Sequence, residues 1–219
     1  MKLPLKTLFA APLLGTLLLA GCAAPTPNPN PVTGTDPSTS ATPTESAANT
    51  PVLVDGEAAP PGTKVGFNTY LTYSYVNTDK EDALLQAKLD SIEPATADEL
   101  AVLTQNFGDK LDVYDIYMLR MTEKKVSGAS VKFNDDWSFF DVVDAKGERI
   151  QSVSLIGWDG CKVNSFTDEY DTAGAELDQC YIGAVPKGSA APGGMAYTGG
   201  YEDGNPYDAF SGKPLLFIP

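Results

Sequence analysis

The side chains of this chain that could do chemistry are mainly carboxylates, because its 219 residues include 29 acidic residues and no histidine. Without histidine, neither a Ser-His-Asp or Cys-His nucleophile nor a histidine-ligated zinc site can form. The Gly-x-Ser-x-Gly, Ser-x-x-Lys and phosphate-loop motifs are absent as well. Paired carboxylates can act as acid and base in glycoside cleavage, and the candidate pairs are Asp135 with Asp136 and Asp168 with Glu169. Acidic proteins carry such pairs on their surfaces, so we expect both pairs to be solvated.

Carboxylates can also bind cations, and the segment "TDEYD" brings Asp168, Glu169 and Asp171 together. Calcium takes oxygen ligands of this kind. The regular spacing of a calcium loop is missing, so a solvated loop is the simpler interpretation. These three residues are therefore weak calcium candidates, and the sequence indicates no other cofactor.

Aromatic rings are the third candidate for function, because they offer a large contact area to a sugar or a protein partner. For Trp137 we expect packing in the core. Tyr201 and Tyr207 stand in a segment rich in Gly and Pro, which predicts exposure in a loop. If the chain has a binding element, this loop is the predicted one. The aromatic candidates are Trp137, Trp158, Tyr197, Tyr201 and Tyr207.

The N-terminus has two lysines, then an apolar run, then small residues. This order is typical of a secretory signal peptide, here residues 1–21, and the run is too short to span a bilayer comfortably as a helix. The segment "LAGC", which ends at Cys22, resembles the lipobox of bacterial lipoproteins. The resemblance implies a diacylglyceryl group on the Cys22 sulfur, cleavage before this residue and a palmitate-type anchor in the cell membrane. The alternatives are an ordinary secreted protein and a single-pass anchor.

Residues 22–63 have the composition of a linker. The stretch after Cys22 holds nine of the seventeen prolines and lacks aromatic residues, Lys and Arg. Such a segment cannot bury enough apolar surface to offset its ordering entropy. We expect a disordered tether, with a glycosylated stalk as the alternative.

Strand patterns occupy residues 64–219. Alternating apolar residues predict a strand within 64–77, and residues 82–92 fit either a strand or a helix. Thr96 and Glu99 have capping-box spacing, which predicts one or two helical turns ending near Gly108. The segment "KLDVYDIYMLRMT" is apolar on both parities and therefore predicts a central strand.

The C-terminal half is expected to contain further short strands. A hairpin is predicted between 137–143 and 149–156, with its turn at Asp144 to Gly147. Short strands are also expected at 180–185, 194–198 and 215–218. About seven strands and one short helix predict a mainly β fold, an Ig-like β-sandwich.

Two cysteines remain once Cys22 carries lipid, and an exported chain favours a disulfide between Cys161 and Cys180. Closing a loop of about twenty residues would stabilise the domain by roughly 3 kcal/mol in the chain-entropy treatment. The two cysteines lack the close spacing of a thiol-exchange motif, so the disulfide is expected to be structural.

Three segments resemble small Ig-like lipoproteins of unknown function from Gram-positive, actinobacterial-type cell envelopes. They are "DVYDIYMLRM", "FFDVVDAKGERI", and "CYIGAVPKG" followed by "MAYTGG". The resemblance implies a lipobox and a Thr/Pro linker before one Ig-like domain. The Cys-Trp-Cys order of antibody domains is absent, because Trp158 precedes Cys161.

These observations predict a non-catalytic binding or structural module, anchored through Cys22 to the outer face of the cell membrane. Its expected partner is an envelope protein or a cell-wall glycan. A formal net charge of -14 repels phosphate backbones, so no nucleic-acid partner is expected. The alternative function is a carboxylate-dependent cell-wall glycan hydrolase.

Overall fold

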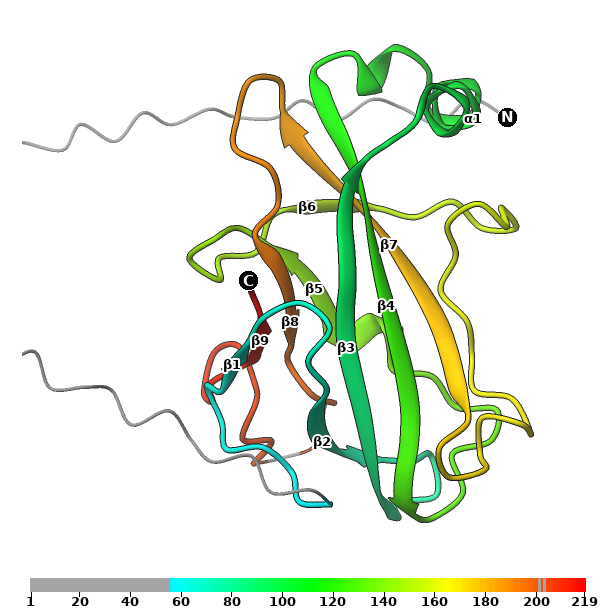
Figure 1. Ribbon diagram of the computed structural model, residues 1–219, viewed down its shortest axis with the longest axis vertical. Coiled ribbons are helices and arrows are strands. Elements are labelled where there is room, and N and C mark those ends of the chain that lie inside the picture. The colour runs from blue at the N-terminus through cyan, green and yellow to red at the C-terminus, as the bar shows by residue number, and fades with distance from the viewer. Residues whose placement is uncertain (1–55, 201, 203) are drawn as a thin grey trace, which may run out of the picture. The chain divides into compact units, whose positions relative to one another are not determined.

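The computed structural model describes residues 56–200, 202 and 204–219 (Figure 1). The predicted signal peptide, Cys22, most of the linker and Tyr201 lie outside the described residues. The described residues are mainly β, with 38% of them in strands and 11% in helices. Two sheets pack face to face as a β-sandwich, which confirms the predicted fold class, with about nine strands rather than seven.

The smaller sheet has four strands and the larger sheet has five. The smaller sheet has the order β1 (Lys64–Val65), β9 (Leu215–Phe217), β8 (Gly194–Tyr197) and β5 (Phe140–Val143). The larger sheet has the order β2 (Leu71–Val76), β3 (Asp82–Pro94), β4 (Tyr114–Gly128), β7 (Glu176–Pro186) and β6 (Gln151–Val153). All neighbours pair antiparallel except β1 and β9, which pair parallel.

The alternation of the β2 segment places its odd-numbered residues, such as Tyr73, inside the sandwich. The ambiguous segment forms β3, because its odd-numbered side chains from Ala83 to Leu89 pack on the same core while the even-numbered ones between them lie nearer solvent. A helix would have broken this alternation. β4 lies between β3 and β7, which confirms the predicted central strand.

β4 is apolar on both faces because each face is covered by a different part of the chain. Leu119 and Met121 pack in the core between the two sheets. Ile116 and Met118 pack on the opposite face in a second cluster, together with Leu103 of the helix. The two-sided apolar pattern of the sequence thus reflects a strand with a core on each side.

The predicted helix is α1 (Ala97–Phe107), followed by a short 3-10 helix, η1 (Gly108–Leu111). Its capping box is formed as predicted, since Glu99 N donates to Thr96 Oγ1 at 3.3 Å and Thr96 N donates to Glu99 Oε2 at 2.8 Å. The helix has about three turns rather than one or two. Among the described residues, no helix has the length and apolar character needed to cross a membrane.

The predicted hairpin at 137–156 is only partly correct. The turn forms, because the Asp144 carboxylate accepts from the backbone N–H groups of Lys146 and Glu148 at 2.8 and 2.9 Å. However, β5 pairs with β8 in the smaller sheet, whereas β6 pairs with β7 in the larger one. A short 3-10 helix, η2 (Trp137–Phe139), precedes β5. The turn is therefore a corner at which the chain crosses between sheets.

The folded part of the chain begins before residue 64. Ala59 is buried in the core, and its N–H donates to the Thr72 carbonyl at 2.8 Å. Thr63 is also buried, and its hydroxyl donates to the Pro60 carbonyl at 2.6 Å. Residues 59–63 thus belong to the sandwich, although their composition placed them in the linker.

Candidate functional site

A cleft lies on the outer face of the smaller sheet, and we call it the β5–β8 cleft. It has a volume of about 620 Å³. Its floor is formed by β5 and β8, and its rim by the Asp144 turn and the loop that connects β8 to β9. Its lining mixes apolar, charged and hydroxyl groups: Ser138, Phe139, Asp141, Val143, Gly147, Glu148, Arg149, Ala196, Thr198, Gly199, Gly200, Asp208, Ala209, Phe210 and Pro214.

The loop from Gly199 to Pro214 is the one that the sequence predicted as a binding element, and it lines this cleft. However, the prediction that Tyr207 is exposed is wrong. Tyr207 is 2% exposed, and its hydroxyl donates to the Ala59 carbonyl at 3.0 Å. Its ring packs beside Tyr197 in the core. Tyr207 therefore anchors the loop, whereas Tyr201 lies outside the described residues.

The exposed aromatic residue of this loop is Phe210, which is 99% exposed. The Asp208 carboxylate fixes the loop tip, because it accepts from Phe210 N at 3.0 Å and from Ser211 N at 2.7 Å. The Ser211 hydroxyl donates to the same oxygen at 2.8 Å. These hydrogen bonds lower the pKa of Asp208. The tip thus holds an apolar ring in water on a defined turn, and ordering such a ring has a low entropic cost in binding.

Charged groups line the same cleft as this ring. Arg149 Nε contacts Asp141 Oδ1 at 3.0 Å. Burial raises the pKa of Asp141, and the Arg149 guanidinium partly opposes this effect. Glu148 lines the cleft next to Arg149 and is exposed. The β5–β8 cleft can therefore accept hydrogen bonds through carboxylates and donate them through one guanidinium.

The two residues of the Asp135–Asp136 pair differ in burial. Asp136 is 0% exposed, which corrects the expectation that this pair is solvated. Its Oδ2 accepts from the Tyr73 hydroxyl at 2.6 Å, and burial raises its pKa to about 7. Glu123 of β4 is equally buried, and burial followed by the charge of Asp136 raises its pKa. The sequence offered no sign of this buried pair.

The calcium candidates do not converge on one site. Asp168 and Glu169 are exposed, and Asp168 pairs with Lys132. Asp171 Oδ1 accepts from Lys125 Nζ at 2.7 Å, and Oδ2 accepts from the Ser130 hydroxyl at 2.7 Å. Although partial burial opposes them, these hydrogen bonds and the Lys125 charge lower the pKa of Asp171 to about 2. Across residues 56–200, 202 and 204–219, no three Asp, Glu or Cys side chains gather as a metal site.

The other aromatic candidates divide between core and surface. Tyr197 is 0% exposed and donates its hydroxyl to the Ser74 carbonyl at 3.0 Å. Trp158 is partly buried against the second cluster. Trp137 is 40% exposed, so the expectation that it packs in the core is wrong. Phe133, also missed by the sequence analysis, is 78% exposed with a φ of 63°, a backbone conformation that is uncommon for a bulky residue.

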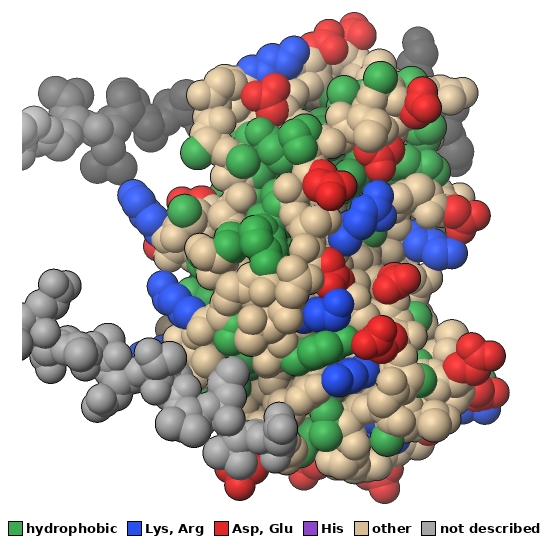
Figure 2. Space-filling view, in the orientation of Figure 1, with side chains coloured by type: hydrophobic (Ala, Val, Ile, Leu, Met, Phe, Trp, Pro, Cys, Tyr) green, Lys and Arg blue, Asp and Glu red, His purple; other side chains and the backbone are tan. Residues whose placement is uncertain are grey.

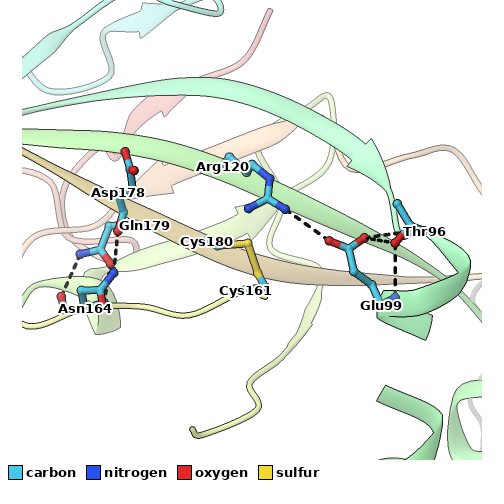
Figure 3. The surroundings of a disulfide bond; sticks show 8 residues. All are labelled: Thr96, Glu99, Arg120, Cys161, Asn164, Asp178, Gln179 and Cys180. Carbon is cyan, nitrogen blue, oxygen red and sulfur yellow. Dashed lines mark hydrogen bonds and ion pairs between the residues drawn. A yellow bond between two sulfur atoms is a disulfide. The ribbon is translucent and has the colours of Figure 1, made fainter. Parts of the chain in front are cut away.

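The predicted disulfide between Cys161 and Cys180 is present, with a Cα–Cα distance of 5.0 Å (Figure 3). It lies in the second cluster, on the face of the larger sheet that α1 also covers. On one side of it, Asn164 Nδ2 donates to the Asp178 carbonyl at 2.7 Å. On the other side, Arg120 Nη2 donates to Glu99 Oε1 at 3.3 Å, which ties β4 to the helix cap. The surroundings support a structural role.

The outer face of the larger sheet carries charges of both signs. Figure 2 shows Lys, Arg, Asp and Glu side chains interspersed over this part of the molecule. Lys124 Nζ lies 3.9 Å from the centroid of the Tyr70 ring, and the Tyr70 hydroxyl donates to Glu176 at 2.7 Å. Lys88 pairs with Asp90 nearby. Side chains of opposite charge lie next to one another here, so this face has no uniform electrostatic potential that would attract a charged polymer.

Comparisons with protein-family models, with curated proteins and with solved structures find no match to this chain. The candidate site is therefore described from the residues of this chain alone.

Proposed function

We propose that this protein is a lipid-anchored, extracytoplasmic, non-catalytic binding module of the cell envelope, whose β5–β8 cleft binds a cell-wall glycan. The observation that carries the proposal is the pairing of an exposed Phe210 ring with carboxylates and a guanidinium along one cleft. Binding sites combine apolar surface with a few polar groups in this way.

The chemistry of the cleft suits an uncharged sugar. The Phe210 ring supports stacking on the C–H face of a sugar, while Asp141 and Glu148 accept hydrogen bonds from its hydroxyls. Arg149 supplies a donor at the same place. A net charge of -14 opposes anionic wall polymers, which favours a neutral glycan.

Attachment through Cys22 rests on the sequence alone. A charged start, an apolar run and small residues precede this cysteine in the order of a lipoprotein leader. The forty or so linker residues, if flexible, would reach roughly 35 Å on average, enough to lift the sandwich into a surrounding wall. The Ig-like lipoproteins that the sequence resembles share this layout.

A labelling experiment tests the anchor. Cells that express the chain are fed an alkyne fatty acid, and membrane extracts are partitioned with detergent. The parent chain is expected to take up label and enter the detergent phase, whereas Cys22→Ser is expected to do neither. Ala24→Ser, which changes a nearby residue and keeps all three cysteines, is the matched control. A processed Cys22→Ser chain that still enters the detergent phase would defeat the proposal.

Co-sedimentation with purified wall glycan tests the cleft. Phe210→Ala is expected to weaken binding roughly tenfold, the size of effect seen when a central aromatic contact is lost. Ile156→Ala is the matched control, because Ile156 is also 99% exposed but lies outside the cleft lining. Equal retention of the two variants would contradict glycan binding in this cleft.

The hydrolase alternative retains one supporting observation. Two carboxylates, those of Asp141 and Asp208, line the same cleft, and glycoside cleavage uses two carboxyl groups. Release of soluble fragments from wall glycan, abolished by Asp141→Asn, would support an enzyme. Retention without release supports the binding module.

A further inference from the structure

Two carboxyl groups face each other inside the sandwich. Glu123 on β4 and Asp136 in the segment before η2 are both 0% exposed. The two groups lie close enough for a side-chain hydrogen bond between them to shift the pKa of each. Two ionised carboxylates cannot form that bond, because neither has a donor. Two like charges at such short range without solvent would also repel strongly.

The four carboxyl oxygens show where a donor is needed. Asp136 Oδ2 accepts from the Tyr73 hydroxyl at 2.6 Å, and Glu123 Oε2 accepts from Gln179 Nε2 at 3.0 Å. The other two oxygens, Asp136 Oδ1 and Glu123 Oε1, are buried without a partner when both groups are taken as ionised. One hydrogen between them would satisfy both atoms at once.

We propose that Glu123 and Asp136 form an internal proton-binding site that holds one proton in the folded protein, with a neutral Glu123 carboxyl group donating to an ionised Asp136. Glu123 is the donor because the hydrogen bond from the Tyr73 hydroxyl favours the ionised form of Asp136. The pair titrates as a unit, so its proton belongs to both residues.

The groups around the pair make loss of this proton unfavourable. They are mostly acids or neutral hydroxyls, and the one nearby lysine on the same face of β4, Lys125, is paired with Asp171. The Tyr170 and Tyr181 hydroxyl oxygens are buried without a partner, so they provide no second neutralising contact. Six further titratable groups interact electrostatically with Glu123 or Asp136. They are Tyr73 and Tyr75 of β2, Asp135, Tyr170, Tyr181 of β7 and Tyr197 of β8.

The proton couples folding to pH. In the unfolded chain, Glu and Asp release their protons near about pH 4.3 and 3.9. In the folded protein burial raises the pKa of both groups, so the shared proton is kept to a higher pH than in the unfolded chain. Between these limits the folded state binds one proton more than the unfolded state, so its stability falls as pH rises. The free energy of unfolding is therefore expected to be larger at mildly acidic pH and smaller towards neutral pH.

Urea unfolding of the purified chain between about pH 5 and pH 7 tests the proposal. The contribution of the pair to the folding equilibrium constant is expected to fall about tenfold per pH unit, equivalent to about 1.4 kcal/mol. Glu123→Gln should remove this contribution, because its amide donates to Asp136 Oδ1 at every pH. Asp135→Asn removes an equal charge one residue away and should keep the dependence. An equal slope in the parent and Glu123→Gln would overturn the proposal.

Carboxyl-carbon NMR of the parent chain gives a second readout that needs no variant. A single protonated carboxyl signal from the pair at about pH 6 is expected. Two ionised signals would overturn the proposal. Stabilisation of the parent by added sodium or calcium, lost in Glu123→Gln, would also overturn it by assigning a metal ion rather than a proton to this place.

Discussion

Removal of the disulfide has an effect that can be worked out from the structure. Cys161 and Cys180 close a loop with a sequence separation of 19, and both are buried. Within the loop, the rings of Phe166 and Tyr170 stack with centroids 4.5 Å apart and pack in the core. Asn164 adds hydrogen bonds to β7. The loop thus has native contacts of its own, which the double variant Cys161→Ala/Cys180→Ala leaves in place.

Most of the loss should therefore come from the unfolded state, which gains conformational freedom. For a loop of about twenty residues this amounts to about 3 kcal/mol. In a domain of this size such a loss lowers Tm by roughly 6 to 12 °C. Urea unfolding should give the same free energy, with a higher m value because the uncrosslinked unfolded chain is more expanded.

Two results would refute this reasoning. A loss below about 1 kcal/mol would show that the unfolded state gains little entropy. Rapid amide hydrogen exchange at Phe166 in an otherwise stable variant would show that the disulfide, rather than the aromatic pair, holds the loop in the native state. Addition of a thiol reductant to the parent chain is the matching control and should reproduce the effect of the double substitution.

Further predictions concern the sheet, the helix and acid stability. Gly194→Ala should abolish folding to a stable domain, as judged by circular dichroism, because the new Cβ would lie 1.9 Å from the Phe217 carbonyl oxygen of the paired strand β9. Thr96→Ala should cost about 1 kcal/mol in urea unfolding by removing the helix cap. The Asp171 carboxylate has its pKa lowered to about 2, so its stabilising contribution is present above about pH 4 and lost as pH falls through 2. Asp171→Asn should flatten the acid limb of a stability profile; an unchanged limb would show that other carboxylates dominate.

Local signals in the sequence predicted local structure well. The capping box at Thr96 and Glu99 gave the start of the helix, because both hydrogen bonds are made within four residues. The central position of β4 followed from its two-sided apolar pattern. The disulfide followed from the predicted export of the chain and from the two cysteines that remain if Cys22 carries lipid.

Features set by distant residues were not predictable in this way. Asp135 and Asp136 are identical in type, yet only Asp136 is fully buried, beneath a tyrosine hydroxyl 63 residues away. Tyr207 has the composition of a loop around it, but its partner is the Ala59 carbonyl, 148 residues away. The corner between β5 and β6 has the turn residues of a hairpin. It differs from a hairpin because β5 pairs with β8 in one sheet and β6 pairs with β7 in the other.

The exposure of Phe210 has a local sequence signal that the composition of the loop does not reveal. Asp208 precedes it by two residues, and Asp at that distance can cap a turn with its own carboxylate. The turn explains why this ring, rather than Tyr207, is presented to solvent. Which ring of the loop is buried depends on the anchor at its base, here the carbonyl of Ala59, 148 residues away from Tyr207.

Photo-crosslinking in intact cells tests the central claim most directly. A benzophenone amino acid is placed at position 210 in one chain and at position 156 in another, since Phe210 and Ile156 are equally exposed. We expect an adduct with cell-wall glycan from position 210, sensitive to a wall-degrading enzyme, and none from position 156. Equal labelling from both positions, or adducts from position 210 with protein alone, would contradict glycan binding in the β5–β8 cleft.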